Sequence, residues 1–304
     1  MSRFDINNFP NLYFNEIDCL SKFIGENNFI QTIISSFHDY DNLYFISKFY
    51  DGFIADYIDD KWNENQLKFF SACIIQSLTA LRKKELIHRD LHFSNLVFDE
   101  RQYINLIDFH ITMQYRKKDE KKNNYLGAFR ICPPEITKGL EYDYNSDYYR
   151  LGSMMYYILF KKYPNDIKKE PNMKDIQINF FDTKNYSISC IDFINKLIIT
   201  EKEKRIGFHD IEELKSHKFF NDFNWEALAE KKLNSPFPKK QRENQGFCNV
   251  EYKFTKKVFL TSNLMKNDTF RNILFTYDII NSFEVYKILQ FFGNNKNNYT
   301  FSTL

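Results

Sequence analysis

The feature that most constrains the fold of this chain is a set of short polar motifs with a fixed order and spacing. The segment Ile87–Val97 reads Ile-His-Arg-Asp-Leu-His-Phe-Ser-Asn-Leu-Val, with Asp90 and Asn95 five residues apart. The other motifs follow along the chain: Asp108-Phe109-His110, Pro133-Pro134-Glu135, Asp147-Tyr148-Tyr149-Arg150-Leu151-Gly152 and Arg205. A single tripeptide of this kind arises by chance, whereas the ordered set points to one fold.

These motifs resemble the catalytic loop H-R-D-L-x-x-x-N, the D-F-G triplet and the A-P-E triplet of the protein kinase family. A narrower likeness is to the AGC group, which includes the cyclic-nucleotide-dependent kinases. It rests on Phe219–Leu228, which contains Trp225, and on Asn234–Lys239 at the expected start of that group's C-terminal tail. The resemblance covers about residues 14 to 250 of the 304.

The resemblance implies an α+β protein-kinase-like fold with a mostly helical C-lobe. The expected N-lobe is incomplete and holds only the helix called αC in kinases and two strands, within residues 1–50. The C-lobe is expected over residues 51–225, and an extended AGC-like tail over 226–304. We find no internal repeat that would suggest another architecture.

The resemblance also assigns roles to individual residues. Asp90 would accept or orient the proton of a substrate hydroxyl, while Asn95 and Asp108 would offer oxygen ligands to Mg²⁺. Val97 would contact the adenine of ATP from below, and Glu16 would be the αC glutamate that pairs with a lysine holding the phosphates. The plainer alternatives are a helix or turn cap for Asp90 and a turn former for Asn95.

Further matches in the sequence are architectural. An ion pair below the activation segment is expected between Glu135 and Arg205, and breaking such a buried pair from one side costs about 3–5 kcal/mol. Four residues match the regulatory spine of kinases, anchored by Asp147: Leu20, Ile33, His88 and Phe109. Each of these also reads as ordinary core, and the two readings agree because the spine is part of the core.

The segment before Glu16 departs most from the family pattern. Only fifteen residues precede it, with no G-x-G-x-x-G and with Arg3 as the sole basic residue. Three strands with their connections need about 35–45 residues. We therefore expect this chain to lack the phosphate-binding loop and the lysine partner of Glu16, so that binding of ATP and Mg²⁺ is weak or absent.

Single positions depart as well. His110 replaces the glycine of D-F-G, and His92 stands where serine/threonine kinases carry a lysine, so a permanent charge becomes a titratable one. Phe53 or Ile54 occupies the place of the acidic residue that holds the ribose. Two changes fall in the activation segment: Ala128 replaces a bracing threonine, and Asn124 stands at the usual phosphothreonine position, which leaves Arg89 without that partner.

Composition excludes several classes of protein. Lys and Arg number 42 against 40 Asp and Glu, and this balance gives no electrostatic case for nucleic-acid or membrane-surface binding. The five cysteines are scattered without a C-x-x-C motif, which favours a reducing, cytoplasmic location. The N-terminus has no signal-peptide core, and no apolar run is long enough to span a bilayer.

Hydrophobic periodicity predicts the main elements. Helices are expected at Glu16–Ile24, Gln66–Lys83, Tyr148–Phe160, Ile191–Ile199 and Asp210–Ser216, and strands at Phe29–Phe37 and Leu43–Phe49. In the tail, Phe270–Tyr277 loosely resembles a hydrophobic motif that docks beside αC, although an ordinary amphipathic surface segment explains it better.

The leading hypothesis is a catalytically impaired pseudokinase that acts as a scaffold or regulator by binding a protein partner, such as a related kinase. The alternative is an active ATP-dependent serine/threonine kinase that acts on a protein substrate. Its N-terminal ATP-binding strands would then be missing from this chain or supplied in trans. A third reading is a nucleotide binder that keeps Mg²⁺ contacts without phosphotransfer.

Overall fold

The structure is a computed structural model, and it describes residues 10–25, 29–38, 43–48, 50–115, 129–167, 178 and 185–239. The chain divides into two compact units. The first comprises Met1–Tyr13, Thr32–Lys48 and Arg242–Leu304, and the second comprises Phe14–Gln31 and Phe49–Gln241.

The described part of the first unit is mainly a β-hairpin. Strand β1 (Ile33–His38) pairs antiparallel with β2 (Leu43–Ser47), so that Ile33 lies opposite Ser47 and His38 opposite Leu43. The register shifts between Ile33 and Ser35. The hairpin confirms the two predicted strands, each shorter than expected.

Helix α1 (Pro10–Ser21) precedes this hairpin in the chain. It starts six residues before the predicted Glu16, and Pro10 is favoured at a helix start because its ring presets φ and its missing N–H is not needed there. It ends three residues before the predicted Ile24, and the chain then turns through Gly25 at φ 74°. That left-handed conformation is easy for glycine and costly for other residues.

The second unit holds two small antiparallel sheets. In the first, β5 (Leu96–Phe98) lies between β3 (Gly52–Phe53) and β6 (Ile104–Leu106). In the second, β4 (Leu86–Ile87) pairs with β7 (Met113–Gln114). The segment 88–95, which carries the expected catalytic loop, connects β4 to β5 and so links the two sheets.

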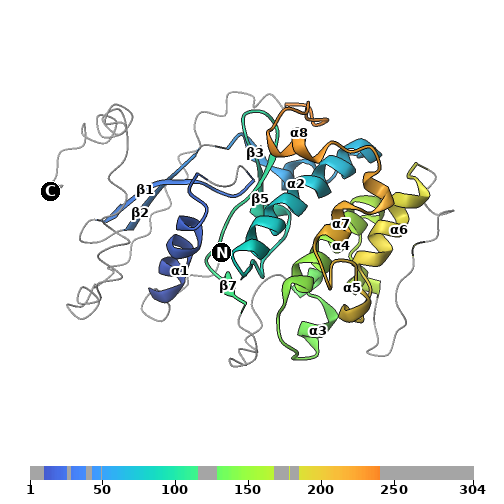
Figure 1. Cartoon of the computed structure of the whole chain (residues 1–304), viewed down its shortest axis with the longest axis horizontal. Coiled ribbons are helices and arrows are strands. Elements are labelled where there is room, and N and C mark those ends of the chain that lie inside the picture. The colour runs from blue at the N-terminus through green and yellow to red at the C-terminus, as the bar shows by residue number, and fades with distance from the viewer. Residues whose placement is uncertain are drawn as a thin grey trace. The chain divides into compact units, whose positions relative to one another are not determined.

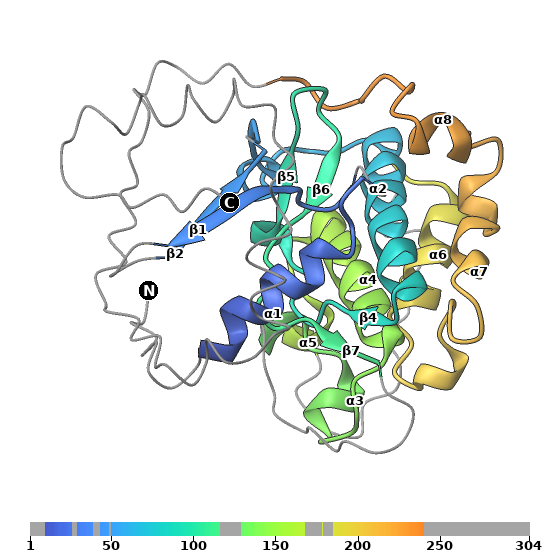
Figure 2. The same ribbon diagram turned by 60° about the vertical axis from the view of Figure 1, so that its left-hand side comes forward.

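Three long helices form the centre of the second unit: α2 (Glu64–Lys83), α4 (Tyr144–Phe160) and α6 (Ile188–Leu197). Helix α4 packs against both α2 and α6, while α2 also packs on β6, as Figures 1 and 2 show. At Gly152 of α4, a Cβ would lie 2.6 Å from Leu197 Cβ of α6. Only glycine therefore allows these two helices to come so close.

Capping explains where the two longest of these helices begin. At α2, Asn63 and Gln66 form a capping box, with side chain to backbone bonds of 2.9 Å in both directions. Asp143 and Ser146 form the same device at the start of α4. The predicted helices at Gln66–Lys83, Tyr148–Phe160 and Ile191–Ile199 are confirmed as α2, α4 and α6, and α4 begins earlier because of its cap.

The other described elements are short. They are η2 (Ile54–Tyr57), η3 (Phe93–Asn95), η4 (Phe129–Ile131), α3 (Pro134–Thr137), α5 (Pro164–Ile167), η6 (Lys202–Lys204), α7 (Glu212–Lys215), η7 (Lys218–Phe220) and α8 (Trp225–Ala229). The helix predicted at Asp210–Ser216 is reduced to the single turn α7.

After α8 the chain runs back along the second unit (Figure 2). We call residues 231–239 of this stretch the strap. Its Phe237 is buried in an aromatic cage, with the nearest ring centres those of Trp62 at 4.8 Å and Phe98 at 5.2 Å. The Tyr103 hydroxyl donates to the Leu233 carbonyl at 2.6 Å. The strap thus packs against residues of the β3–β5–β6 sheet and its connections. The predicted tail motif at 270–277 lies outside the described residues.

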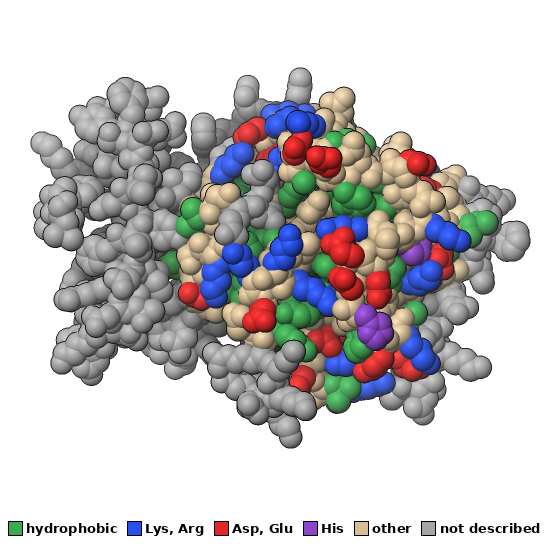
Figure 3. Space-filling view, in the orientation of Figure 1, with side chains coloured by type: hydrophobic (Ala, Val, Ile, Leu, Met, Phe, Trp, Pro, Cys, Tyr) green, Lys and Arg blue, Asp and Glu red, His purple; other side chains and the backbone are tan. Residues whose placement is uncertain are grey.

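The surface of the second unit mixes charges. On the face seen in Figure 3, lysine and arginine side chains alternate with aspartate and glutamate over the described part, without a large region of one sign. None of the helices in the described ranges is long and apolar enough to cross a membrane.

Candidate active site

Helix α4 holds the backbone of the loop that follows β4 through the side chain of Asp147. The buried Asp147 carboxylate accepts the backbone N–H groups of His88 at 2.8 Å and Arg89 at 3.0 Å. Burial raises the pKa of Asp147 to about 6, although the nearby Arg150 guanidinium acts in the opposite direction. Arg89 takes a left-handed φ of 71°, a strained conformation that these two bonds hold in place.

Asp90 is fixed through one oxygen and left open at the other. Asn95 Nδ2 donates to the Asp90 carbonyl at 2.9 Å and to Asp90 Oδ2 at 3.2 Å. Asp90 Oδ1 is buried without a hydrogen-bond partner among the described residues. The structure therefore brings two of the predicted site residues, Asp90 and Asn95, into direct contact.

His92 holds the same oxygen of Asp90. Its Nε2 lies 3.3 Å from Asp90 Oδ2, and its Nδ1 accepts the Ser94 N–H at 3.2 Å. Because Nδ1 is an acceptor, the ring proton sits on Nε2 and points at the carboxylate. Burial, the largest single effect, would raise the pKa of Asp90, but the bond from His92 and the nearby His92, His88 and Arg150 side chains together lower it to about 2.

His88 lies beneath this loop and stays neutral. Its Nδ1 accepts the Asp90 N–H at 3.3 Å, and its Nε2 lies 3.3 Å from the Ile107 carbonyl. Burial lowers the pKa of His88 to about 4, against the pull of the nearby Asp90 and Asp108 carboxylates. Its ring meets the buried Phe109 ring edge-on at 5.0 Å, which confirms that these two spine residues pack together.

The Asp108-Phe109-His110 triplet is braced by side chains from outside the catalytic loop. Asp108 has φ 68°, and its N–H donates to Gln31 Oε1 at 3.3 Å. The Phe109 N–H donates to Glu16 Oε1 at 3.4 Å, and Asn15 Nδ2 donates to the His110 carbonyl at 3.1 Å. Sequence reasoning missed Asn15 and Gln31, since their partners are backbone groups that no motif reveals.

The Glu16 carboxylate accepts a hydrogen bond from the backbone of the Asp108-Phe109-His110 triplet. Within the described ranges no ion pair joins its carboxylate to a lysine or arginine, and its bond to Phe109 is the contact it makes. Burial and the nearby Asp108 raise the pKa of Glu16 to about 7. The role of Glu16 in holding a phosphate-binding lysine stays a prediction.

Asp108 also meets the residue two positions further on. His110 Nδ1 is in direct contact with Asp108 Oδ1. This bond raises the pKa of His110 and, against the effect of burial, lowers the pKa of Asp108. A histidine thus engages each of the two carboxylates that the sequence assigned to chemistry, Asp90 and Asp108.

The donor set bears on Mg²⁺ binding. Asn95 and Asp108 are oxygen donors of the type that Mg²⁺ prefers, but this ion demands near-octahedral geometry and free carboxylate oxygens. Asp108 Oδ1 is already taken by His110, so the residues as placed do not fit Mg²⁺. The described residues contain no group of three or more His, Cys, Asp or Glu side chains that could hold a metal.

The expected nucleotide contacts lie on the β3–β5 pair. Val97 is buried on β5, directly opposite Phe53 of β3. Phe53 is 45% exposed, whereas Ile54 is fully buried. An apolar ring therefore reaches the surface where the resemblance predicted a ribose-binding carboxylate.

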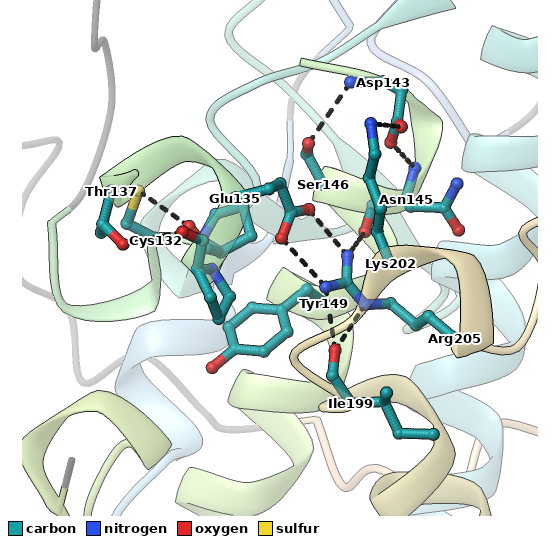
Figure 4. A network of polar contacts seen from close by, with 12 residues as sticks. Cys132, Glu135, Thr137, Asp143, Asn145, Ser146, Tyr149, Ile199, Lys202 and Arg205 are labelled. Atoms are coloured by element: carbon teal, nitrogen blue, oxygen red, sulfur yellow. Dashed lines mark hydrogen bonds and ion pairs between the residues drawn. The ribbon is translucent and has the colours of Figure 1, made fainter. Parts of the chain in front are cut away.

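The predicted ion pair below the activation segment is confirmed (Figure 4). Arg205 donates to both Glu135 oxygens, at 2.8 and 3.0 Å, with side chains that are 0% and 3% exposed. Arg205 also donates to the carbonyls of Asn145 at 2.7 Å and Ile199 at 2.9 Å. The pair therefore ties α3 and the start of α4 to the segment that follows α6.

Arg89 points to an aromatic partner. Its guanidinium lies 4.5 Å from the centre of the Tyr142 ring, a cation–π contact. Asn124 and Ala128, which the sequence placed near this arginine and the catalytic loop, lie outside the described residues.

Comparison with known proteins agrees with this geometry. The family model described as protein kinase domain matches residues 3–220. The serine/threonine-protein kinase sgk-1 of Caenorhabditis elegans is 27% identical over 234 residues, which cover 75% of this chain and 50% of that protein. Protein kinase C delta type of Homo sapiens is 28% identical over 251 residues, covering 80% of this chain and 36% of that protein.

The serine/threonine-protein kinase YPK1 of Saccharomyces cerevisiae is 25% identical over 234 residues, covering 75% of this chain and 34% of that protein. The chain therefore spans half or less of the length of these relatives. Since the family model covers well over half of the chain, the chain belongs to the protein kinase domain family, with relatives among the AGC-type serine/threonine kinases.

Proposed function

We propose that this chain is a catalytically impaired kinase homologue that acts as a scaffold or regulator by binding a protein partner, such as a related kinase. The observation that carries the proposal is the engagement of Asp90 by His92 and of Asp108 by His110. One oxygen of each carboxylate is thereby engaged by a side chain of its own loop. We further propose a reducing, cytoplasmic location, supported by the buried free thiols of Cys19, Cys73, Cys132 and Cys190.

The chemistry supports weak catalysis. A general base works best with a pKa near the working pH, and a pKa of about 2 makes Asp90 a poor proton acceptor. His92 stands where the family resemblance implies a lysine. A histidine is charged only when it is protonated, whereas a lysine is charged at neutral pH. Loss of one preorganised donor at a charged transition state lowers a rate by about 10²–10³-fold.

The contacts that hold the framework around the site support a binding role. Asp147 holds the loop backbone, Phe109 is buried, and Arg205 is fully bonded to Glu135. This framework does not depend on nucleotide for any of the contacts described. A rigid kinase-like surface without efficient phosphotransfer is suited to recognition of another protein.

One observation favours the rival proposal of an active serine/threonine kinase that uses ATP and Mg²⁺. Asn95 holds the Asp90 carboxylate through Oδ2. The other oxygen, Oδ1, has no hydrogen bond from the described residues, as expected of an acceptor for a substrate hydroxyl. In that case ATP-binding strands from a longer chain or from a partner would complete the site.

Two measurements on the full chain separate the proposals. The first is the melting temperature with and without Mg-ATP, because a ligand at about 100 times its Kd adds about 2.7 kcal/mol to stability. The second is transfer of radiolabelled phosphate from ATP to a basic peptide. We expect a negligible melting shift and no transfer above background. Transfer that disappears in Asp90→Asn would overturn the scaffold proposal and establish the kinase.

A further inference from the structure

The contact between His110 and Asp108 follows from the local backbone. Asp108 takes a left-handed φ of 68°, which turns the chain sharply at this point. The imidazole thereby meets Asp108 Oδ1 directly. The two side chains are 35% and 38% exposed, so they meet at the surface of the site.

The backbone around this contact is fixed independently of it. Gln31 holds the Asp108 N–H, Glu16 holds the Phe109 N–H, and Asn15 holds the His110 carbonyl. None of these bonds involves the imidazole. Rotation or removal of the His110 side chain would therefore free the Asp108 oxygen without a change in the course of the chain.

The surroundings otherwise suit a cation. The Glu16 and Asp90 carboxylates act on the same region as Asp108. In the part of the chain that the structure describes, no lysine or arginine forms an ion pair with any of these three acids. The Asn95 amide nitrogen is turned toward Asp90, which leaves its oxygen for a ligand. Among the described residues, the side chain that contacts the Asp108 carboxylate is the His110 imidazole.

From this geometry we propose that His110 is a built-in plug of a divalent-cation site formed by Asp108 and Asn95. The imidazole N–H occupies the carboxylate oxygen that a cation needs, and its removal converts the chain into a divalent-cation binder. This inference deepens the proposed function, on which it rests, because it names the side chain that keeps the cation out.

The test is Mn²⁺ binding to the full chain, measured at one fixed pH from the electron paramagnetic resonance signal of free Mn²⁺. Wild type is compared with His110→Gly. A hydrogen bond to a charged group contributes about 1.5–3 kcal/mol, which corresponds to roughly 10- to 100-fold in a dissociation constant. We therefore expect His110→Gly to bind Mn²⁺ about 10- to 100-fold more tightly than wild type.

Two controls make the result specific. The double variant His110→Gly with Asp108→Asn is expected to return to the wild-type affinity, because it removes the ligand that the plug covers. His209→Gly makes the same change at an exposed histidine outside the site and is expected to bind as wild type does. If His110→Gly fails to fold by circular dichroism, His110→Ala replaces it.

Equal Mn²⁺ affinity in wild type and the folded His110 variant would overturn the plug. So would a gain that persists when Asp108 is also changed. The outcome is separable from that of the proposed function, because phosphotransfer by wild type would defeat the impaired-kinase proposal whatever the Mn²⁺ result. Conversely, an inactive wild type with no gain in His110→Gly would defeat the plug alone.

Discussion

Two buried or partly buried acidic side chains of this molecule are paired with different basic residues. Glu135 is paired with Arg205 in a fully buried, bidentate arrangement, whereas Asp108 is paired with His110 at a partly exposed position. Arginine keeps its proton at any pH that a protein experiences, while histidine changes charge near neutrality. The pair that supports the fold is therefore permanent, and the pair in the site is conditional.

The two pairs therefore differ in what depends on them: the Arg205 pair stabilises the fold of the C-lobe, and the His110 pair sets the state of one carboxylate in the candidate site. Arg205 also bonds the carbonyls of Asn145 and Ile199, so its loss would disturb several segments at once. His110 contacts the side chain of Asp108, and its loss would disturb one carboxylate. The difference between fold-supporting and site residues can be measured as a change in the free energy of unfolding of single variants.

The largest effect is expected at the permanent pair. Arg205→Met leaves Glu135 buried without a cation, and this should lower the free energy of unfolding by about 3–5 kcal/mol. Urea denaturation measures the loss. Lys204→Met, in an exposed pair with Glu201, is the matched control and should change stability by less than about 1 kcal/mol. Similar small losses in both variants would show that the buried pair does not support the fold as described.

An intermediate, pH-dependent effect is expected at Glu16. Its folded-state pKa of about 7 lies above the usual 4.5, so folding favours the protonated form. Stability from this group is present below pH 4.5 and is lost as the pH rises toward 7. Glu16→Gln keeps an acceptor for the Phe109 N–H and removes the charge. It should therefore be more stable than wild type by about 3 kcal/mol at pH 8, with no difference at pH 4.

Thermal or urea unfolding at several pH values provides the measurement. Asp147, whose pKa is also raised, contributes equally to wild type and Glu16→Gln and cancels in the difference. Glu141→Gln, at an exposed position, is the control and should stay within about 0.5 kcal/mol of wild type throughout. A constant difference between Glu16→Gln and wild type across the range would contradict a proton-linked carboxyl.

The smallest effect is expected at Asp90. Asp90→Asn preserves an oxygen that can accept from Asn95, but it removes a buried carboxylate whose pKa the site lowers to about 2, so the free energy of unfolding at pH 7 should fall by about 2 kcal/mol. If the chain is a scaffold, the proteins that it captures from a cell lysate, identified by mass spectrometry, should be the same for this variant. A changed set from a variant that is still folded at the temperature of the assay would count against the scaffold proposal.

The sequence predicted those parts of the molecule that depend on spacing along the chain. The interval from Asp90 to Asn95 predicted two side chains in one loop, and the order of motifs predicted the distant contact between Glu135 and Arg205. Helices α2, α4 and α6 were visible because their buried faces repeat every three to four residues. The early start of α1 was not, because a proline such as Pro10 is found both at the first position of a helix and in loops.

The details that decide the state of the site could not be predicted in this way. Asn15 and Gln31 act on backbone groups of the Asp108 loop, and such bonds leave no pattern in side-chain types. His110 could be recognised as a departure from glycine, but its contact with Asp108 depends on a left-handed backbone at Asp108. The cage around Phe237 joins side chains from four separate segments, which only the folded chain brings together.

The strap has a practical consequence for anyone who shortens this protein. Truncation after α8 would remove Phe237 and expose to water the rings of Trp62 and Phe98 that now enclose it. Such a fragment would expose an apolar patch that is buried in the longer chain, and it would tend to self-associate. The smallest piece worth expressing on its own therefore retains at least residue 239.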